Sequence, residues 1–481
     1  MEEAPRGFCQ SQAAGQTDPG MVLVEYNMRH FYFFRPPTSD LRLPLFVFLV
    51  VALGVWALVV VGAAVQITTR LFDARDLMQQ AKQEAAALSF DAAATSLFEA
   101  KQDIGAARRA LPLVRSTAWL PFVGSPVDAL ADVIDGMDAV IGSFEPIMAL
   151  GGELIRLSGL GEASLEQARE GLAPEVTFDD LATDTKRVML RRLSASAHEL
   201  DLLAAQMSIL QEELTLARRA RGIAALDGVL DSLTQDLEAV GEPLRLLAVA
   251  ARLLPSFGGL DEPSSTLLLF LNNDELRPGG GFIGTYGLLE MSGGDIARLS
   301  TADVYALDDA AAGAATRPAP DPLVRYNEAS AWYMRDSNWS PDFAASSRKT
   351  IELFLEEAAS LPQGSSVPVV ERIDQVVGFT PTYAADLLTI TGPITVGGQT
   401  FTSQNVSDLL EYQVEFGFAR DGLPLSQRKE ILADLVNEMK SRLYALPVAQ
   451  WPAVLDASRK ALAQKQLLLY SADEAVQEVL A

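Results

Sequence analysis

Cysteine and histidine are scarce in this sequence. Cys9 is the sole cysteine among the 481 residues, and the two histidines are His30 and His198. The chain therefore cannot form a disulfide within itself, and it cannot assemble a zinc site from Cys and His ligands. Any metal bound here would be a hard cation held by carboxylates. We expect both histidines to lie on the solvated surface.

Basic residues are also few. Lys and Arg number 38 against 63 Asp and Glu, which gives a formal net charge of -25. No basic patch of the kind that follows a phosphate backbone is visible, so we expect no nucleic-acid partner. The remaining composition is that of a folded protein, since 49% of the 481 residues are hydrophobic. A chain of this length has room for two or three domains.

One stretch lacks charged side chains altogether. Residues 45–65 read LFVFLVVALGVWALVVVGAAV and contain no charged or strongly polar residue. About 21 residues, at about 1.5 Å each, cross a hydrocarbon core of about 30 Å. The stretch is longer than the apolar region of a signal peptide, and about 40 residues precede it. We therefore expect an uncleaved transmembrane helix over 44–66 that contacts the lipid bilayer through 45–65.

Flanking charge hardly distinguishes the two orientations of this helix. Three basic residues lie on each side of the span: Arg29, Arg35 and Arg42 before it, and Arg70, Arg75 and Lys82 after it. The more economical arrangement leaves Cys9 inside and the cysteine-free bulk outside. Residues 1–43 mix Gly, Pro, Gln and Ser with scattered charges, which predicts a disordered cytoplasmic tail. We expect a single-pass protein of the cell membrane whose bulk is extracytoplasmic.

Residues 67–254 are rich in Ala, Leu, Glu, Arg and Gln, which predict helices almost throughout. One apolar stripe recurs at intervals of three or four residues, as core positions of packed helices do. It comprises Leu193, Ala197, Leu200, Leu203, Met207, Leu210 and Leu214. Breaks are expected at 111–126, at 159–161, around Pro174 and at 241–243. The pattern predicts an elongated antiparallel helical bundle, or stalk, with surface available to protein partners.

Short β-type runs alternate with helical segments over residues 255–481, after a linker rich in Pro, Gly and Ser. We expect strands at 266–271, 285–291, 372–379, 394–396 and 466–470. We expect helices at 346–359, 380–390, 405–412 and 425–444. The alternation predicts a domain of the α+β or α/β class, a sandwich with a mixed sheet. The sequence ends in a helix-like stretch with no stop signal, so we expect this domain to be shortened at its C-terminus.

The stretch NNDELRPGGGFIGTYG, residues 272–287, contains the pattern G-x-G-x-x-G. A dinucleotide site needs a helix after such glycines, so that the pyrophosphate meets the helix N-terminus. Here the β-prone run TYGLLEM follows, and no lysine completes a phosphate-binding loop. We expect a tight structural turn between two strands. Its residues are Pro278, Gly279, Gly280, Gly281 and Gly284.

Polar residues lead into this turn. If residues 272–277 are extended, Asn273, Glu275 and Arg277 share one face. Ligands of α/β proteins collect beyond the carboxyl ends of parallel strands, which is where this segment would lie. These residues either stabilise the turn or bind a ligand directly, and both roles stay open at the level of the sequence.

A second polar cluster, WYMRDSNWSPDF, occupies residues 332–343. It combines two tryptophans with Arg335, Asp336, Asn338 and Asp342. Aromatic rings beside Arg and Asp suit a sugar or a polar head group, and they equally suit the packing of an irregular loop. Asn followed two residues later by Ser-Pro favours a turn.

Three motifs together resemble the family catalogued as domain of unknown function 4012, found in bacterial envelope proteins with one N-terminal anchor. They are LLLFLNNDELRPGGGFIGTYG, RDSNWSPDF and IDQVVGFTPTYAADLLTITGPITV. The resemblance covers roughly residues 225–481. Members usually carry a further β-rich segment after the stretch that is similar to KQLLLYSADEAVQEVLA.

A more distant likeness is to the LytR-CpsA-Psr envelope transferases, which also have an anchor and an α/β/α domain. That resemblance implies an Arg/Asp site that binds the pyrophosphate of a polyprenyl-linked glycan with Mg²⁺. Asp274 and Arg277 are the nearest counterparts of its strand-and-aspartate motif, and Arg335 and Asp336 match its Arg-Asp pair. The Asn-Asn and Pro-Gly-Gly-Gly segments depart from the family pattern, so catalysis is left open.

Two functional hypotheses follow. In the first, the outer domain binds a glycan or lipid-linked glycan in surface polysaccharide assembly. Asn273, Glu275, Arg277, Arg335 and Asn338 are its candidate ligand-binding residues, and Asp274 and Asp336 are the candidates for a metal ligand or a base. In the second, the protein is a non-enzymatic scaffold, with the helical region as its protein-interaction surface.

Overall fold

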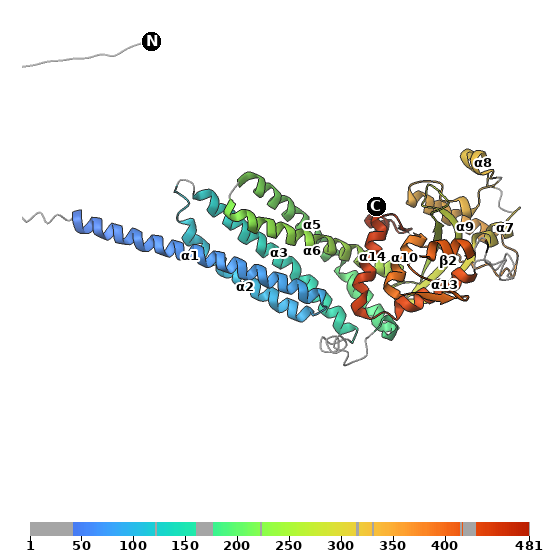
Figure 1. The fold of residues 1–481 in the computed structure, drawn as a ribbon, viewed down its shortest axis with the longest axis horizontal. Helices are drawn as coiled ribbons and strands as arrows, with labels where there is room; N and C mark the ends of the chain where they lie inside the picture. Colours follow the sequence, from blue (N-terminus) through green and yellow to red (C-terminus); the bar gives the residue numbers. More distant parts are fainter. Residues whose placement is uncertain are drawn as a thin grey trace, which may run out of the picture. The chain divides into compact units, whose positions relative to one another are not determined.

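The computed structural model describes residues 42–120, 123–159, 177–221, 224–313, 317–329, 331–413, 416 and 430–480. The expected tail lies outside the described residues except at 42 and 43, and so do Cys9, His30 and the break around Pro174. The chain divides into two compact units, Met1–Leu58 and Val59–Ala481. The predicted class is confirmed: a long apolar helix precedes helices and then a domain with a mixed sheet (Figure 1).

The apolar run lies in helix α1, Arg42–Ala86, which does not end at residue 66. The segment after Val65 contains neither Gly nor Pro before Ala86, so no backbone breaker stops the helix. Among the described residues α1 is the helix that is long and apolar enough to cross a membrane. Large apolar side chains from Leu45 to Val65 are exposed.

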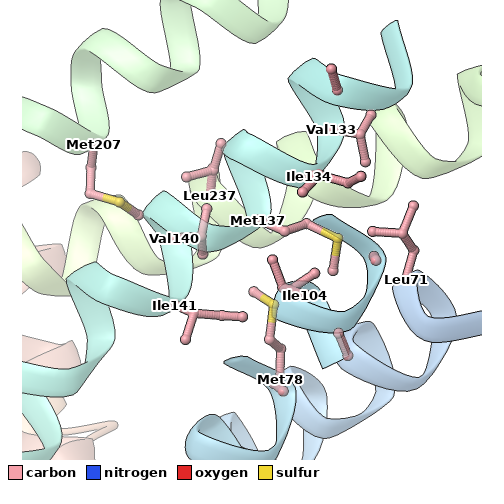
Figure 2. Close-up of a cluster of buried hydrophobic side chains, with 14 of the residues drawn as sticks. Leu71, Met78, Ile104, Val133, Ile134, Met137, Val140, Ile141, Met207 and Leu237 are labelled. Carbon is pink, nitrogen blue, oxygen red and sulfur yellow. The ribbon is translucent and has the colours of Figure 1, made fainter. Parts of the chain in front are cut away.

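Four further helices build one core with the part of α1 after Leu58. They are α2 (Phe90–Arg115), α3 (Gly124–Leu157), α5 (Thr183–Arg221) and α6 (Ala224–Phe257). Side chains from all five point toward one another in Figure 2, with Leu71 and Met78 from α1 and Ile104 from α2. The helices are held together by burial of these apolar surfaces, each full side chain contributing about 1.5–3 kcal/mol.

The predicted apolar stripe on α5 is confirmed as far as its side chains are described: Leu193, Leu200 and Met207 are buried in this core, and Ala197, Leu203 and Leu210 pack against it. The Leu214 side chain lies outside the described residues. The break expected at 111–126 is narrower in the structure, because α2 runs to Arg115 and α3 begins at Gly124. Of the break expected at 159–161, Gly159 alone is described, just after α3. The break at 241–243 is wrong, because α6 continues through Gly241 and Pro243. Leu237, Leu244 and Ala248 are buried on the same helix. This packing outweighs the local cost of a proline and a glycine within the helix.

The domain's main sheet has the strand order β3-β2-β1-β4-β7. The strands are β1 (Ser264–Asn272), β2 (Phe282–Ser292), β3 (Asp295–Asp303), β4 (Gln375–Phe379) and β7 (Leu467–Ser471). β1 is parallel to β4, while the β1–β2, β2–β3 and β4–β7 pairs are antiparallel, so the predicted mixed sheet is confirmed. The sequence did not predict β3, because DIARLSTAD is polar and shows no alternation of buried and exposed residues. The position of β3 at the edge of the sheet tolerates such a sequence.

One face of the sheet carries the core that supports the polar motifs. Leu267, Leu269 and Leu271 alternate along β1 and pack with Phe354 of α9 (Phe343–Ala359). The short helix α7 (Val304–Ala310) adds Val304 and Leu307 to the same cluster. The cluster therefore joins the sheet to the two helices that lie next to the second polar motif.

A second small core lies among the remaining C-terminal elements. It is built by α10 (Pro381–Thr391), β5 (Ile394–Val396), β6 (Gln399–Phe401), α11 (Val406–Tyr412), α13 (Glu430–Tyr444) and α14 (Trp451–Ala463). α8 (Asp321–Asn327) and α15 (Glu474–Leu480) complete the described helices of this domain. The expected helices at 380–390 and 405–412 and the strand at 394–396 are confirmed; β6 and α14 were not expected.

The helical region meets the sheet through an ion pair whose lysine is buried and whose carboxylate is partly exposed. Lys186 of α5 donates to Asp295 at the start of β3 (Nζ to Oδ1, 2.6 Å), and Thr183 donates to the other carboxylate oxygen. The Lys186 ammonium also lies over the ring of Phe178, 4.6 Å from its centroid. Burial acts to raise the pKa of Asp295, but the hydrogen bonds from Lys186 and Thr183 outweigh it, and the net pKa is lowered.

Candidate functional site

The loop between β1 and β2 carries the first polar motif. Asn272 ends β1, and its side-chain Oδ1 accepts the N–H of Asp274 (3.1 Å) while its carbonyl accepts the N–H of Glu275 (3.3 Å). This is an Asx-type turn, in which a short polar side chain replaces the strand ladder as the backbone's partner. The expected extended conformation of 272–277, with alternate residues sharing one face, is therefore wrong.

The glycines of this loop are needed for two different reasons. Gly280 and Gly281 have φ values of 105° and 141°, which side chains rarely tolerate. Gly279 is needed for space, because a Cβ there would lie 2.7 Å from both Cβ and O of Asn338. Gly284 lies inside β2, so no helix N-terminus follows the G-x-G-x-x-G pattern. The structure places Pro278, Gly279, Gly280 and Gly281 in the connection between β1 and β2, as expected, whereas Gly284, expected in the same turn, lies in β2.

Asn338 joins the second polar motif to this loop through two hydrogen bonds. Its carbonyl accepts the N–H of Gly279 (3.0 Å), and its Nδ2 donates to the carbonyl of Gly281 (2.6 Å). The Asn338 side chain is buried, so it holds the loop in shape and is not open to a ligand. Asn273 is half-buried, and its Oδ1 meets no hydrogen-bond partner among the described residues.

Two arginines from the two motifs converge on Asp336. Arg277 belongs to the glycine loop, while Arg335 and Asp336 belong to the short 3-10 helix η2 (Met334–Asp336). Arg277 Nε lies 3.9 Å from Asp336 Oδ1, and Arg335 Nε lies 3.6 Å from Asp336 Oδ2. Arg277 also donates to Glu275 (Nη2 to Oε1, 3.0 Å). The sequence placed these residues in two separate motifs, and the fold brings them into one site.

Aromatic rings hold both guanidinium groups in place. Arg277 lies over Phe282, with its central carbon 5.2 Å from the ring centroid. Arg335 lies over Tyr305 at 5.2 Å and over Tyr333 at 4.6 Å. Such cation–π contacts occupy the faces of the two guanidinium planes and not their N–H edges, which already donate to Glu275 from Arg277 and to Asp308 from Arg335. The Arg277 and Arg335 side chains remain 15% and 23% exposed, respectively.

Asp336 lies largely buried between the two cations. Burial raises its pKa, and the attraction of Arg335 and Arg277 only partly offsets that rise, while Glu275 adds to it. The other catalytic candidate, Asp274, is exposed, and Ser407 Oγ lies 3.5 Å from its Oδ2. The carboxylate that lies between the two arginines is therefore that of Asp336 and not that of Asp274.

Sequence reasoning missed two carboxyl groups behind Arg335. Asp308 of α7 accepts from Arg335 (Nη1 to Oδ2, 2.7 Å), and Glu357 of α9 accepts the N–H of Met334 (2.8 Å). Both are fully buried. A signal for Glu357 was present, because it follows the buried Leu353 and Phe354 by four and three residues and so shares their helix face. Asp308 had no comparable signal within the short α7.

The donor set does not favour a metal ion. Within the described residues, no group of three or more His, Cys, Asp or Glu side chains is arranged to hold one. Around Asp336 the nearest charged groups are the guanidinium groups of Arg277 and Arg335. The geometry is that of a site whose positive charge comes from arginine. The residues of this site therefore do not fit the Mg²⁺ that the transferase likeness implies.

Comparison with known proteins gives one match to a family model, described as a protein of unknown function, DUF4012, over residues 261–414. Residues 261–414 belong to the DUF4012 family. No curated protein and no solved structure matches the chain.

The DUF4012 segment contains the whole arginine site. It begins just before β1, includes the glycine loop, α7, η2 and α9, and ends after α11. The helices before residue 261 and the elements after 414 lie outside the match. The site is therefore a property of the DUF4012 segment itself, and the resemblance expected from the three motifs is confirmed for that segment.

Proposed function

We propose that the DUF4012 domain of this protein binds a lipid-linked glycan through its pyrophosphate, in the assembly of a surface polysaccharide. The observation that supports this most is the convergence of Arg277 and Arg335, two ring-stacked and partly exposed guanidinium groups from separate motifs. Two planar cations held in one place suit the several oxygens of a pyrophosphate, which accept paired hydrogen bonds.

Each of the two polar motifs also carries an exposed apolar side chain. Leu276, which precedes Arg277, is 86% exposed, and Trp339, which follows Asn338, is also exposed. Large apolar groups held in water are unfavourable unless something covers them. Beside a phosphate-binding site they suit the lipid chain or sugar face of an amphiphilic ligand. This combination favours a polyprenyl-linked pyrophosphate over a free inorganic anion.

The proposal places the domain outside the cell. Helix α1 is long and apolar enough to anchor the chain in a membrane. Lipid-linked intermediates of surface polysaccharides are consumed on the outer face of the membrane, where an anchored domain meets them at high effective concentration. We therefore propose that residues 1–43 are cytoplasmic and that residues 67–481 are extracytoplasmic.

Binding to the full-length protein in detergent tests the function. Calorimetry would compare a short-chain polyprenyl-pyrophosphate sugar, inorganic pyrophosphate and the same sugar without phosphate. We expect the first ligand to bind, the second to bind more weakly, and the third not to bind. Arg277→Ala and Arg335→Ala should each weaken binding about tenfold or more, because a hydrogen bond to a charged group contributes about 1.5–3 kcal/mol.

Arg298→Ala is the matched control. Arg298 lies on β3 of the same domain, pairs with Glu290 (3.2 Å) and has no contact with the arginine site in the described residues. Its removal should leave affinity within twofold. Equal affinity of wild type, Arg277→Ala and Arg335→Ala, or tight binding of the phosphate-free sugar, would exclude the pyrophosphate proposal.

A second function, protein interaction through the helical region, is favoured by one surface. On α5 the apolar residues Val188, Leu202 and Ile209 are exposed at a spacing of multiples of seven, and Ala195 is exposed in the same register. A photo-crosslinking residue at Leu202 should trap a discrete protein in membranes, whereas one at the exposed Glu199 should trap less. A monomer band alone at both positions would count against the scaffold.

A further inference from the structure

Two carboxyl groups are completely buried beneath Arg335. Asp308 comes from α7 and Glu357 from α9, and neither has solvent-exposed surface. Arg335 donates to Asp308 Oδ2 (2.7 Å), and the Met334 N–H donates to Glu357 Oε1 (2.8 Å). One oxygen of each carboxyl group is thus bonded to η2, the short helix that carries Arg335.

The second oxygen of each carboxyl group is the informative one. Asp308 Oδ1 and Glu357 Oε2 are buried and meet no N–H or hydroxyl donor in the described part of the chain. The two carboxyl groups do lie within hydrogen-bonding reach of each other. Two ionised carboxylates buried in contact with each other would repel strongly. One proton held between them satisfies both oxygens, since a protonated carboxyl group is a donor.

We infer that Glu357 is protonated, that it donates its proton to a hydrogen bond with Asp308, and that this buried acid–carboxylate pair positions Arg335 for the ligand. The inference rests on the proposed function where it concerns the ligand. It makes Asp308 and Glu357 positioning residues that do not touch the pyrophosphate. The charges balance locally, because one carboxylate, Asp308, meets one guanidinium group, Arg335.

The ionisation of the pair is consistent with its surroundings. Burial, and then the nearby charge of Asp308, raise the pKa of Glu357 to about 9. Burial raises the pKa of Asp308 to about 6, against the lowering effects of Glu357 and Arg335. The shared proton resides on Glu357 and not on Asp308, because the guanidinium group of Arg335 stabilises the Asp308 carboxylate directly.

The other titratable groups that face the pair do not replace this proton. Arg335 approaches from η2 and binds Asp308, and beyond it lies Asp336. Tyr286 approaches from β2, but its hydroxyl donates to the carbonyl of Pro368 (2.8 Å). Burial, then Asp308 and Glu357, raise the pKa of Tyr286, which keeps the hydroxyl neutral. Tyr305, on α7 with Asp308, stacks on Arg335.

The pH dependence of the stability of the unliganded full-length protein tests whether the two carboxyl groups share a proton. A raised folded-state pKa means that stability is fully present below the ordinary Glu pKa, near 4.3, and is lost as pH rises toward about 9. Glu357→Gln keeps a donor and an acceptor but cannot ionise. Its melting temperature should match wild type near pH 5 and exceed it increasingly up to pH 9. Glu356→Gln, one residue away on the exposed side of α9, should show no such divergence.

Ligand binding by two Glu357 variants distinguishes a role in positioning Arg335 from a role in folding alone. Glu357→Gln should bind the polyprenyl-pyrophosphate sugar within twofold of wild type at pH 7. Glu357→Ala, which leaves Asp308 Oδ1 and the Met334 N–H without a partner, should bind about tenfold more weakly. An ordinary titration of the ¹³C-labelled Glu357 carboxyl group near pH 4–5, or unchanged binding by Glu357→Ala, overturns the inference. If wild type binds no pyrophosphate ligand, the proposed function fails, while the pH profile of Glu357→Gln still decides the pair.

Discussion

Asp336 lies where an anionic ligand would have to meet the two arginines, so its own charge competes with that ligand. Its carboxylate oxygens are 3.9 Å from Arg277 Nε and 3.6 Å from Arg335 Nε. Removing the negative charge should leave both guanidinium groups more attractive to phosphate oxygens. At the scale of single residues, replacing Asp336 therefore distinguishes a site that binds anions from a site in which Asp336 acts as a base.

Asp336→Asn should bind the polyprenyl-pyrophosphate sugar several-fold more tightly than wild type, a gain of about 1 kcal/mol. Because burial raises the pKa of Asp336, wild-type affinity should also increase as pH falls and the carboxyl group becomes protonated. The variant should lose this pH dependence. Calorimetry from pH 5 to pH 8 measures both effects. Weaker binding by Asp336→Asn would show that the carboxylate contacts the ligand directly, for example through a sugar hydroxyl.

Gly279 is the point at which the two polar motifs touch. In Gly279→Ala the new Cβ would lie 2.7 Å from Asn338 Cβ and O, so the loop or η2 must shift. We expect a loss of about 1–3 kcal/mol of stability and weaker ligand binding, since overpacked contacts carry that penalty. Gly142→Ala, within α3 and with nothing within 4 Å of its Cβ, should be neutral or stabilising by about 0.5–1 kcal/mol. Thermal and denaturant unfolding of both variants checks the contrast.

At the scale of secondary structure, the sequence predicted elements whose signal is local and missed contacts that depend on the fold. Apolar runs predict the strand at 266–271 and the strand after the glycine turn. The turn itself follows from backbone conformations that residues other than glycine rarely adopt. β3 and the continuity of α6 depend on neighbours that stabilise a weak local pattern. The meeting of Arg277 with Asp336 joins segments far apart in the chain, which periodicity cannot reveal.

The ion pair between α5 and β3 joins the helical region to the sheet. Lys186 is nearly buried, and its ammonium lies 2.6 Å from Asp295 Oδ1. Asp295→Ala would leave the lysine charge without its carboxylate, a change that typically costs about 3–5 kcal/mol in buried pairs. Lys186→Met removes the charge and keeps the apolar stem over the Phe178 ring, so it should cost less, about 0–2 kcal/mol.

Denaturant unfolding distinguishes these two variants, with Arg298→Ala as a surface control on the same strand pair. The sign of the pH effect follows from the lowered pKa of Asp295. Stability from this pair is present above the ordinary Asp pKa, near 3.9, and is lost as pH falls through the folded-state value. Equal losses for Asp295→Ala and Lys186→Met would mean that solvent reaches the lysine when its partner is gone.

At the scale of the whole molecule, the sole cysteine makes orientation measurable. The proposed arrangement leaves Cys9 in the cytoplasm and the domain outside. A membrane-impermeant maleimide should therefore label wild type only after cells are permeabilised. In a Cys9→Ser background, Glu262→Cys, at an exposed side chain beside β1, should react in intact cells. Cys9→Ser alone is the unlabelled control.

The reverse labelling pattern would place the arginine site in the cytoplasm and remove it from glycan chemistry outside the cell. That outcome would still be compatible with pyrophosphate binding in a purified sample, so the two measurements are independent. A domain that binds the polyprenyl-pyrophosphate sugar and is labelled from outside has both the chemistry and the location that the proposal requires. Binding without outside labelling would instead point to a cytoplasmic step, at which lipid-linked glycans are built before they cross the membrane.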